Sequence, residues 1–103
     1  PIQHFKDGMA SSMHLYLLRI NGIGAIQRDK LFFKMAECGI ACLVHYKPLP
    51  MMTAYKKLGF DIKDFPNAFS QYQNEISIPL HTLLSDDDVH YVVDSLNNSL
   101  LSI

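Results

Sequence analysis

The C-terminal segment carries an apolar stripe at helical spacing, and this stripe demands a partner surface. Ser85 is a favourable helix cap, and the three aspartates after it complement the positive end of a helix dipole. Five apolar residues then recur on one face of that helix: Val89, Val92, Val93, Leu96 and Leu100. Such a helix gains most of its stability from packing that face against another element. We therefore predict a helix over residues 86–100 that covers a core.

The rest of the chain supplies elements for this helix to cover. Apolar and aromatic runs favour strands, and the i, i+4, i+7 recurrence of Leu31, Met35 and Cys38 indicates a helix that ends at Gly39. Arg28 is placed on its polar outer face, with Asp29 and its charged neighbours. The expected order is an irregular lead-in (1–12), a strand (13–20), a helix (25–38), a strand (41–46), a long loop (47–65), a helix (67–74), a strand (75–78) and the last helix.

This order predicts an α+β fold, with a small sheet of about three short strands covered by helices. With 103 residues, 49% of them hydrophobic, we expect a single domain over residues 1–103. Nine basic and ten acidic residues argue against a nucleic-acid partner. The longest apolar run falls well short of the ~20 residues of a membrane span, so no membrane partner is expected.

The cysteines and the N-terminus bear on compartment. Cys38 and Cys42 are too few for the disulfide framework of a small secreted domain, and no histidine pair completes a zinc spacing with them. We expect two reduced cysteines, no metal and a cytoplasmic location. The sequence has no signal peptide and opens without Met, which suggests a piece of a longer chain.

Recognisable chemistry is sparse, and one segment stands out. There is no glycine-rich phosphate loop and no nucleophile motif. His45, Tyr46 and Lys47 follow one another at a predicted strand end, where alternation would put His45 and Lys47 on one face and Tyr46 on the other. An imidazole beside an ammonium suits an anionic ligand such as a phosphate or carboxylate. A polar strand end at the surface explains the same residues.

Several motifs in order resemble the DegT/StrS family of sugar aminotransferases, which use pyridoxal phosphate (PLP). The similarity begins at Gly39-Ile40 and the following Val-His-Tyr-Lys-Pro-Leu of residues 44–49. It continues through residues 55–60 (YKKLGF), 64–68 (DFPNA), 75–81 (EISIPLH) and 84–89 (LSDDDV), and upstream His14-Leu15-Tyr16 resembles the first strand of the family's small domain. The resemblance covers about residues 12–96.

The resemblance implies the C-terminal small domain of a fold-type I PLP-dependent transferase. In this family a large N-terminal domain supplies the Schiff-base lysine, the acid at the pyridine nitrogen and most phosphate contacts. None of the lysines here lies in that lysine motif, so we expect no catalytic residue and no bound cofactor in this chain. By itself it should transfer no amino group.

The parent enzyme is expected to move an amino group from an amino acid, commonly glutamate, to a keto sugar on a nucleotide. It would work as a homodimer, with this domain closing one side of the site. The matching positions make His45 and Lys47 the expected substrate-binding residues, with Tyr46 as a further candidate. Family members often carry a histidine where this chain has Pro50, which leaves the sugar preference open.

Two alternatives remain at this point. The small domain could exist alone as a non-catalytic binding or interaction module, or it could be a ligand-binding α+β domain with an incidental likeness to the family. What lies upstream in the native polypeptide distinguishes the first alternative from the enzyme.

Overall fold

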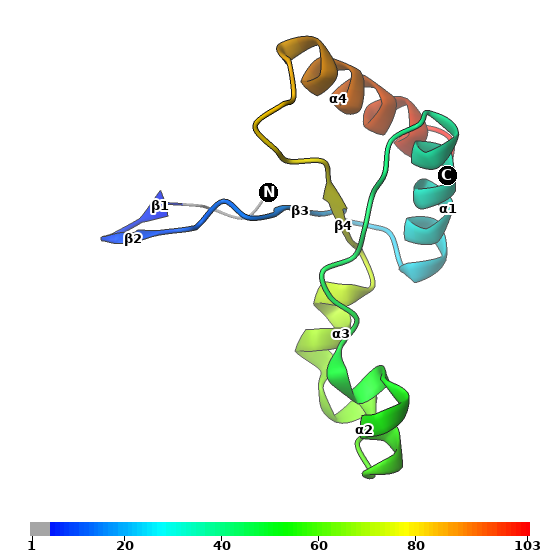
Figure 1. The fold of residues 1–103 in the computed structure, drawn as a ribbon. Coiled ribbons are helices and arrows are strands. Elements are labelled where there is room, and N and C mark those ends of the chain that lie inside the picture. Colours follow the sequence, from blue (N-terminus) through cyan, green and yellow to red (C-terminus); the bar gives the residue numbers. More distant parts are fainter. Residues whose placement is uncertain (1–4) are drawn as a thin grey trace.

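A computed structural model describes residues 5–103, and its elements follow the predicted order, with four corrections to the sequence predictions (Figure 1). The strands are β1 (Phe5–Lys6), β2 (Met9–Ala10), β3 (Tyr16–Arg19) and β4 (Glu75–Ile78). The α-helices are α1 (Ala25–Glu37), α2 (Thr53–Lys57), α3 (Pro66–Tyr72) and α4 (Asp86–Leu100), and two short 3-10 helices lie at Leu49–Met51 and Ile62–Asp64.

The central sheet pairs two strands from opposite ends of the chain. β3 and β4 run antiparallel, with Tyr16 opposite Ile78 and Arg19 opposite Glu75. The strand predicted over residues 41–46 is wrong in extent, because only one bridge, between Leu43 and Ser77, joins that segment to β4. The ladder stops there because the next available amide, that of His45, donates to a side-chain carboxylate instead of a backbone carbonyl.

One core holds α1, α4 and the sheet together. α1 packs against α4, and Ile76 of β4 is fully buried with them. The buried apolar side chains are Leu31, Met35, Ile40, Ile76, Val92 and Leu96. The predicted end of α1 is confirmed: Gly39 has a φ of +73°, and the Ile40 amide donates to the Met35 carbonyl at 2.9 Å.

The polar face predicted for α1 is wrong at one residue. Arg28 is only 2% exposed, although the pattern placed it outside. Its guanidinium donates to Asp29 at 2.7 Å and to the Tyr72 carbonyl at 2.8 Å, and it lies 4.8 Å from the centre of the Tyr72 ring. The arginine is buried because its planar donors satisfy the carbonyl groups where α3 ends.

The other corrections concern segments predicted as irregular. Residues 5–10 form the hairpin of β1 and β2 within the expected lead-in, whose first four residues lie outside the described part. The expected loop over 47–65 contains α2 and the two 3-10 helices. These elements have one or two turns each, too short to show a 3.6-residue period. In this segment the Phe60 ring packs between two others, with its centroid 5.9 Å from that of Tyr55 and 6.3 Å from that of Phe65.

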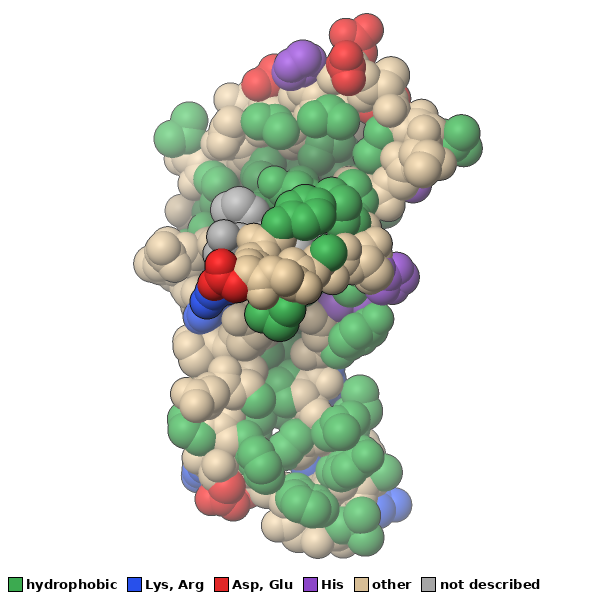
Figure 2. All heavy atoms as spheres, turned by 90° about the vertical axis from the view of Figure 1, so that its left-hand side faces the viewer, with side chains coloured by type: hydrophobic (Ala, Val, Ile, Leu, Met, Phe, Trp, Pro, Cys, Tyr) green, Lys and Arg blue, Asp and Glu red, His purple; other side chains and the backbone are tan. Residues whose placement is uncertain are grey.

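The molecule is less compact than its length implies. Its radius of gyration is 15.5 Å, against about 13 Å for a compact chain of this size. Figure 1 shows why: the β1–β2 hairpin and the α2–α3 region extend from the core in different directions. Figure 2 shows hydrophobic side chains spread over one face from α4 down to the α2–α3 region. No helix within residues 5–103 has the length and apolar character to span a membrane.

The predicted cap of α4 is confirmed and yields a stability prediction. The Ser85 hydroxyl accepts from the Asp88 amide at 3.1 Å, while the Asp88 carboxylate accepts from the Ser85 amide at 2.9 Å. Ser85→Ala should lower the free energy of unfolding by about 1 kcal/mol, measured by urea denaturation at pH 7. Asp86→Asn, which leaves these bonds in place, is the matched control, and an equal loss in both variants would contradict the cap.

Candidate functional site

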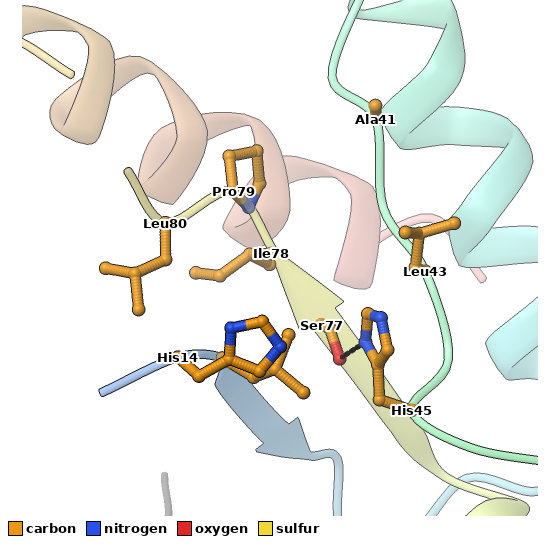
Figure 3. Close-up of a pocket in the computed structure, with 9 residues that line it drawn as sticks. His14, Ala41, Leu43, His45, Ser77, Ile78, Pro79 and Leu80 are labelled. Carbon is orange, nitrogen blue, oxygen red and sulfur yellow. Dashed lines mark hydrogen bonds between the residues drawn. The ribbon is translucent and has the colours of Figure 1, made fainter. Parts of the chain in front are cut away.

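A small pocket lies where three segments meet at one side of the central sheet (Figure 3). Its volume is about 210 Å³. Its walls come from the residues before β3, from the stretch after α1 and from the end of β4. They comprise His14, Leu15, Ala41, Leu43, His45, Ser77, Ile78, Pro79 and Leu80. The pocket is therefore mostly apolar, with two imidazoles and one hydroxyl as its polar groups.

A buried carboxylate lies behind this pocket. Glu75 is 1% exposed, and each of its oxygens accepts one hydrogen bond. Oε2 accepts from the His45 backbone amide at 2.9 Å, and Oε1 accepts from the Ser77 hydroxyl at 2.7 Å. The Ser77 oxygen in turn lies 2.8 Å from Nδ1 of His45. Glu75, Ser77 and His45 thus form one hydrogen-bonded chain that leads from the interior to the pocket.

The local sequence explains how β4 carries both this chain and the core. Side chains alternate along a strand, so Ile76 and Ile78 share one face and Glu75 and Ser77 share the other. Ile76 enters the hydrophobic core, while the polar pair faces the segment that holds His45. The bridge from Leu43 to Ser77, with N–O distances of 2.8 and 3.1 Å, fixes that segment two residues before His45.

The three predicted site residues occupy different surroundings. His45 is half-buried and lines the pocket. The Tyr46 side chain is 68% exposed, and its ring meets the His45 ring edge-on with centroids 4.7 Å apart. Lys47 is exposed and forms no hydrogen bond or ion pair with any of residues 5–103. Strand alternation no longer argues for a shared face of His45 and Lys47, because this stretch is not a strand.

Sequence reasoning missed three polar participants in this site. His14 is exposed, and its ring lines the same pocket as His45 and Ser77 (Figure 3). Nothing in the local pattern around His14 marks it. Glu75 and Ser77 did leave a signal, since polar residues alternating with isoleucines in a buried strand need partners on their own face.

The acidic cluster that begins α4 acts as a helix start, as the sequence indicates. Asp86, Asp87 and Asp88 fill the first turn, and the Ser85 hydroxyl bonded to Asp88 lowers the pKa of that carboxyl group. Within the described residues no three histidine, cysteine or acidic side chains are grouped to hold a metal ion.

Both cysteines are free thiols, and the environment of Cys42 gives a reactivity prediction. Burial raises the pKa of Cys42 to about 11, so its thiolate fraction at pH 8 is about 100-fold lower than for an ordinary thiol. In a Cys38→Ser background, iodoacetamide should modify Cys42 about 100-fold more slowly in the folded chain than in urea. Similar rates in both conditions would contradict the burial of this thiol.

The same pKa shift predicts that the folded chain loses stability at high pH. Because folding favours the neutral thiol, Cys42 contributes stability below its unfolded pKa of 9.0, and this contribution is lost as the pH rises toward 11. Cys42→Ala should therefore show a shallower fall in stability between these pH values.

Comparison with solved structures places this fold among sugar aminotransferases. The PMP-form of the putative sugar aminotransferase Spr1654 from Streptococcus pneumoniae superimposes with a TM-score of 0.93 and 43% sequence identity, over 96% of this chain and 25% of that one. The PLP-form of the same protein gives a TM-score of 0.91 and 44% identity. The α+β fold and its resemblance to the small domain of these enzymes are thereby confirmed.

Sequence comparison gives the family. The profile of the DegT/DnrJ/EryC1/StrS aminotransferase family matches residues 1–97, and the chain belongs to this family. A UDP-4-amino-4,6-dideoxy-N-acetyl-beta-L-altrosamine transaminase from Campylobacter jejuni is 38% identical over 91 residues, which are 88% of this chain and 24% of the relative. The spore coat polysaccharide biosynthesis protein SpsC from Bacillus subtilis is 32% identical over 89% of the chain and 24% of the relative. The chain thus spans about a quarter of the length of its relatives.

Proposed function

We propose that this chain is the C-terminal small domain of a PLP-dependent aminotransferase. The enzyme transfers an amino group from an amino acid, glutamate, to a keto sugar linked to a nucleotide, in the cytoplasm. The observation that carries the proposal is the full-domain match at 43% identity to a sugar aminotransferase of which this chain covers one quarter. The transaminase from Campylobacter jejuni, whose name specifies a UDP-linked sugar, supports the substrate class.

The residues that line this pocket do not fit a PLP site. Covalent attachment of PLP needs a lysine, and the wall of the pocket contains none. Lys47, the lysine nearest in sequence to His45, lies outside that wall and is exposed. We therefore assign the cofactor to the remaining three quarters of the enzyme. The chain alone is inactive in this proposal, and its contribution is to substrate binding.

In this proposal the pocket receives part of the sugar nucleotide. Its 210 Å³ is below the roughly 300 Å³ at which pockets for small molecules begin, so it takes only one portion of so large a substrate. His45 presents its imidazole to the substrate from a position fixed by its hydrogen bonds. Lys47, which has no partner among residues 5–103, offers its ammonium to a diphosphate oxygen. Tyr46 contributes its exposed phenol beside them.

Apolar side chains exposed on the surface of this domain support the proposal that other parts of the enzyme cover it. We assign these partners as the large N-terminal domain and a second subunit. Leu83 and Ile26 are 87% and 74% exposed, and Met9 at the hairpin is 68% exposed. Val89 and Val93 belong to the predicted apolar stripe of α4, yet they remain more than 40% exposed. A surface of this kind is typical of an element that another domain covers.

The test uses the native polypeptide. An antibody against this domain should detect a band several times heavier than 11.7 kDa in the cells of origin. The purified native protein should then show PLP absorbance and should aminate a nucleotide-linked keto sugar with glutamate as donor. A native band near 11.7 kDa would overturn the proposal of an aminotransferase and would favour a non-catalytic binding module.

A further inference from the structure

The directions of the hydrogen bonds among Glu75, Ser77 and His45 determine which ring nitrogen of His45 carries the proton. Distances alone do not determine this. Glu75 as a carboxylate only accepts hydrogen bonds, and the backbone amide of His45 only donates. Ser77 has a single hydroxyl proton, which it gives to Oε1 of Glu75 at 2.7 Å. Its oxygen then meets Nδ1 of His45 at 2.8 Å only as an acceptor. With Glu75 ionised, the imidazole therefore carries its proton on Nδ1.

We propose that Glu75 and Ser77 are positioning residues that hold neutral His45 in the Nδ1–H tautomer. Nε2 is then the ring nitrogen with a free lone pair, available to a hydrogen-bond donor such as a sugar hydroxyl in the pocket. The use of Nε2 by substrate rests on the function proposed above, whereas the tautomer is a property of the chain without ligand.

The burial of Glu75 and Ser77 supports their role in holding His45. Glu75 is 1% exposed and Ser77 is 5% exposed, so water does not replace either partner at the interior end of the chain. Glu75 also holds the backbone at His45, because its Oε2 accepts the amide of that residue at 2.9 Å. One carboxylate therefore fixes both the main chain and, through Ser77, the ring of the same histidine.

Glu75→Gln is the informative variant, because it reverses the direction of the hydrogen bonds through Ser77 with almost no change in side-chain shape. The single carbonyl oxygen of glutamine must accept from the His45 amide, which leaves the NH₂ group facing Ser77. The Ser77 hydroxyl then accepts from the amide and donates its own proton to Nδ1 of His45. The neutral ring is forced into the Nε2–H tautomer.

The measurement is the ¹⁵N shift of the two His45 ring nitrogens, in ¹⁵N-labelled chain without ligand at about pH 8. The unprotonated nitrogen resonates far downfield of the protonated one. We expect Nε2 downfield in the unmodified chain, Nδ1 downfield in Glu75→Gln, and two converging intermediate shifts in Ser77→Ala. His14→Ala, which alters the same pocket outside this hydrogen-bonded chain, should leave the His45 shifts unchanged.

Nδ1 downfield in the unmodified chain would overturn the proposal, as would a Ser77→Ala spectrum with unmoved His45 shifts. The unmodified chain alone decides the tautomer, so the proposal stays testable if Glu75→Gln does not fold. In the full native enzyme Glu75→Gln should raise KM for the sugar nucleotide about tenfold and leave the half-reaction with the amino donor unchanged. Because the tautomer is read without substrate, a failed transaminase assay is distinguishable from a failed tautomer assignment.

Discussion

Arg28→Ala should lower the free energy of unfolding by about 3 kcal/mol, although the sequence pattern places this residue on an exposed helix face. The guanidinium donates to the Tyr72 carbonyl at 2.8 Å and to the Glu75 carbonyl at 3.5 Å. Alanine would leave these carbonyls without their donor, at roughly 1–3 kcal/mol for each buried group. It would also remove the cation–π contacts with the Tyr72 and Phe32 rings, at 4.8 and 5.8 Å.

The effect should spread beyond the helix that carries Arg28. Its partners lie where α3 ends and β4 begins, so the arginine ties α1 to the strand that holds the pocket. Asp29, its ion-pair partner, is largely exposed and contributes little, since solvent screens it. The loss therefore comes from buried hydrogen bonds and ring contacts more than from the salt bridge.

Urea denaturation of the chain at pH 7, followed by far-UV circular dichroism, measures this loss. Lys30→Ala is the matched control, because it removes an exposed cation from the same helix and should change stability by less than about 0.5 kcal/mol. Arg28→Lys should recover only part of the loss, since one ammonium does not reproduce the planar donor set. A loss below about 1 kcal/mol in Arg28→Ala would contradict its role in linking α1 to β4.

The secondary structure that sequence analysis predicted well is the part governed by local rules. The cap at Ser85 and the stop at Gly39 each depend on a few neighbouring residues, and both hold in the structure. The burial of Arg28 depends on carbonyl groups 44 and 47 residues away, which no helical period encodes. Likewise, the stretch from 41 to 46 has strand composition but forms a single bridge, because Glu75 takes the His45 amide.

The same reasoning predicts only part of the candidate site. His45 is indicated both by the imidazole beside an ammonium and by the family resemblance, and the structure places it on a pocket. Glu75 and Ser77, which hold it, lie 30 and 32 residues further along, and their link to His45 exists only once β4 and the 43–45 segment are side by side. His14 joins the same pocket from the start of the chain, and its spacing carries no signal.

In the full-length enzyme that we propose, His45→Ala should lower kcat/KM for the nucleotide-linked keto sugar by about 10- to 100-fold. Removal of the imidazole would leave the sugar hydroxyl in the pocket without its acceptor, at about 1–3 kcal/mol, and each 1.36 kcal/mol is tenfold in rate. The fold should survive, because the Glu75 carboxylate still accepts the backbone amide of residue 45 and the Ser77 hydroxyl. The half-reaction with the amino donor should keep its rate, since it does not involve the sugar nucleotide.

His90→Ala separates a local effect of His45 from a general one. His90 lies exposed on α4 and does not line the pocket, so its removal should leave both half-reactions unchanged. Lys47→Ala should raise KM for the sugar nucleotide without altering the amino-donor half-reaction, whereas Lys57→Ala, on an exposed part of α2, should alter neither. If His45→Ala slows both half-reactions equally, His45 supports folding instead of substrate binding. A selective loss, with circular dichroism unchanged, would place the sugar nucleotide at the pocket that β4 helps to build.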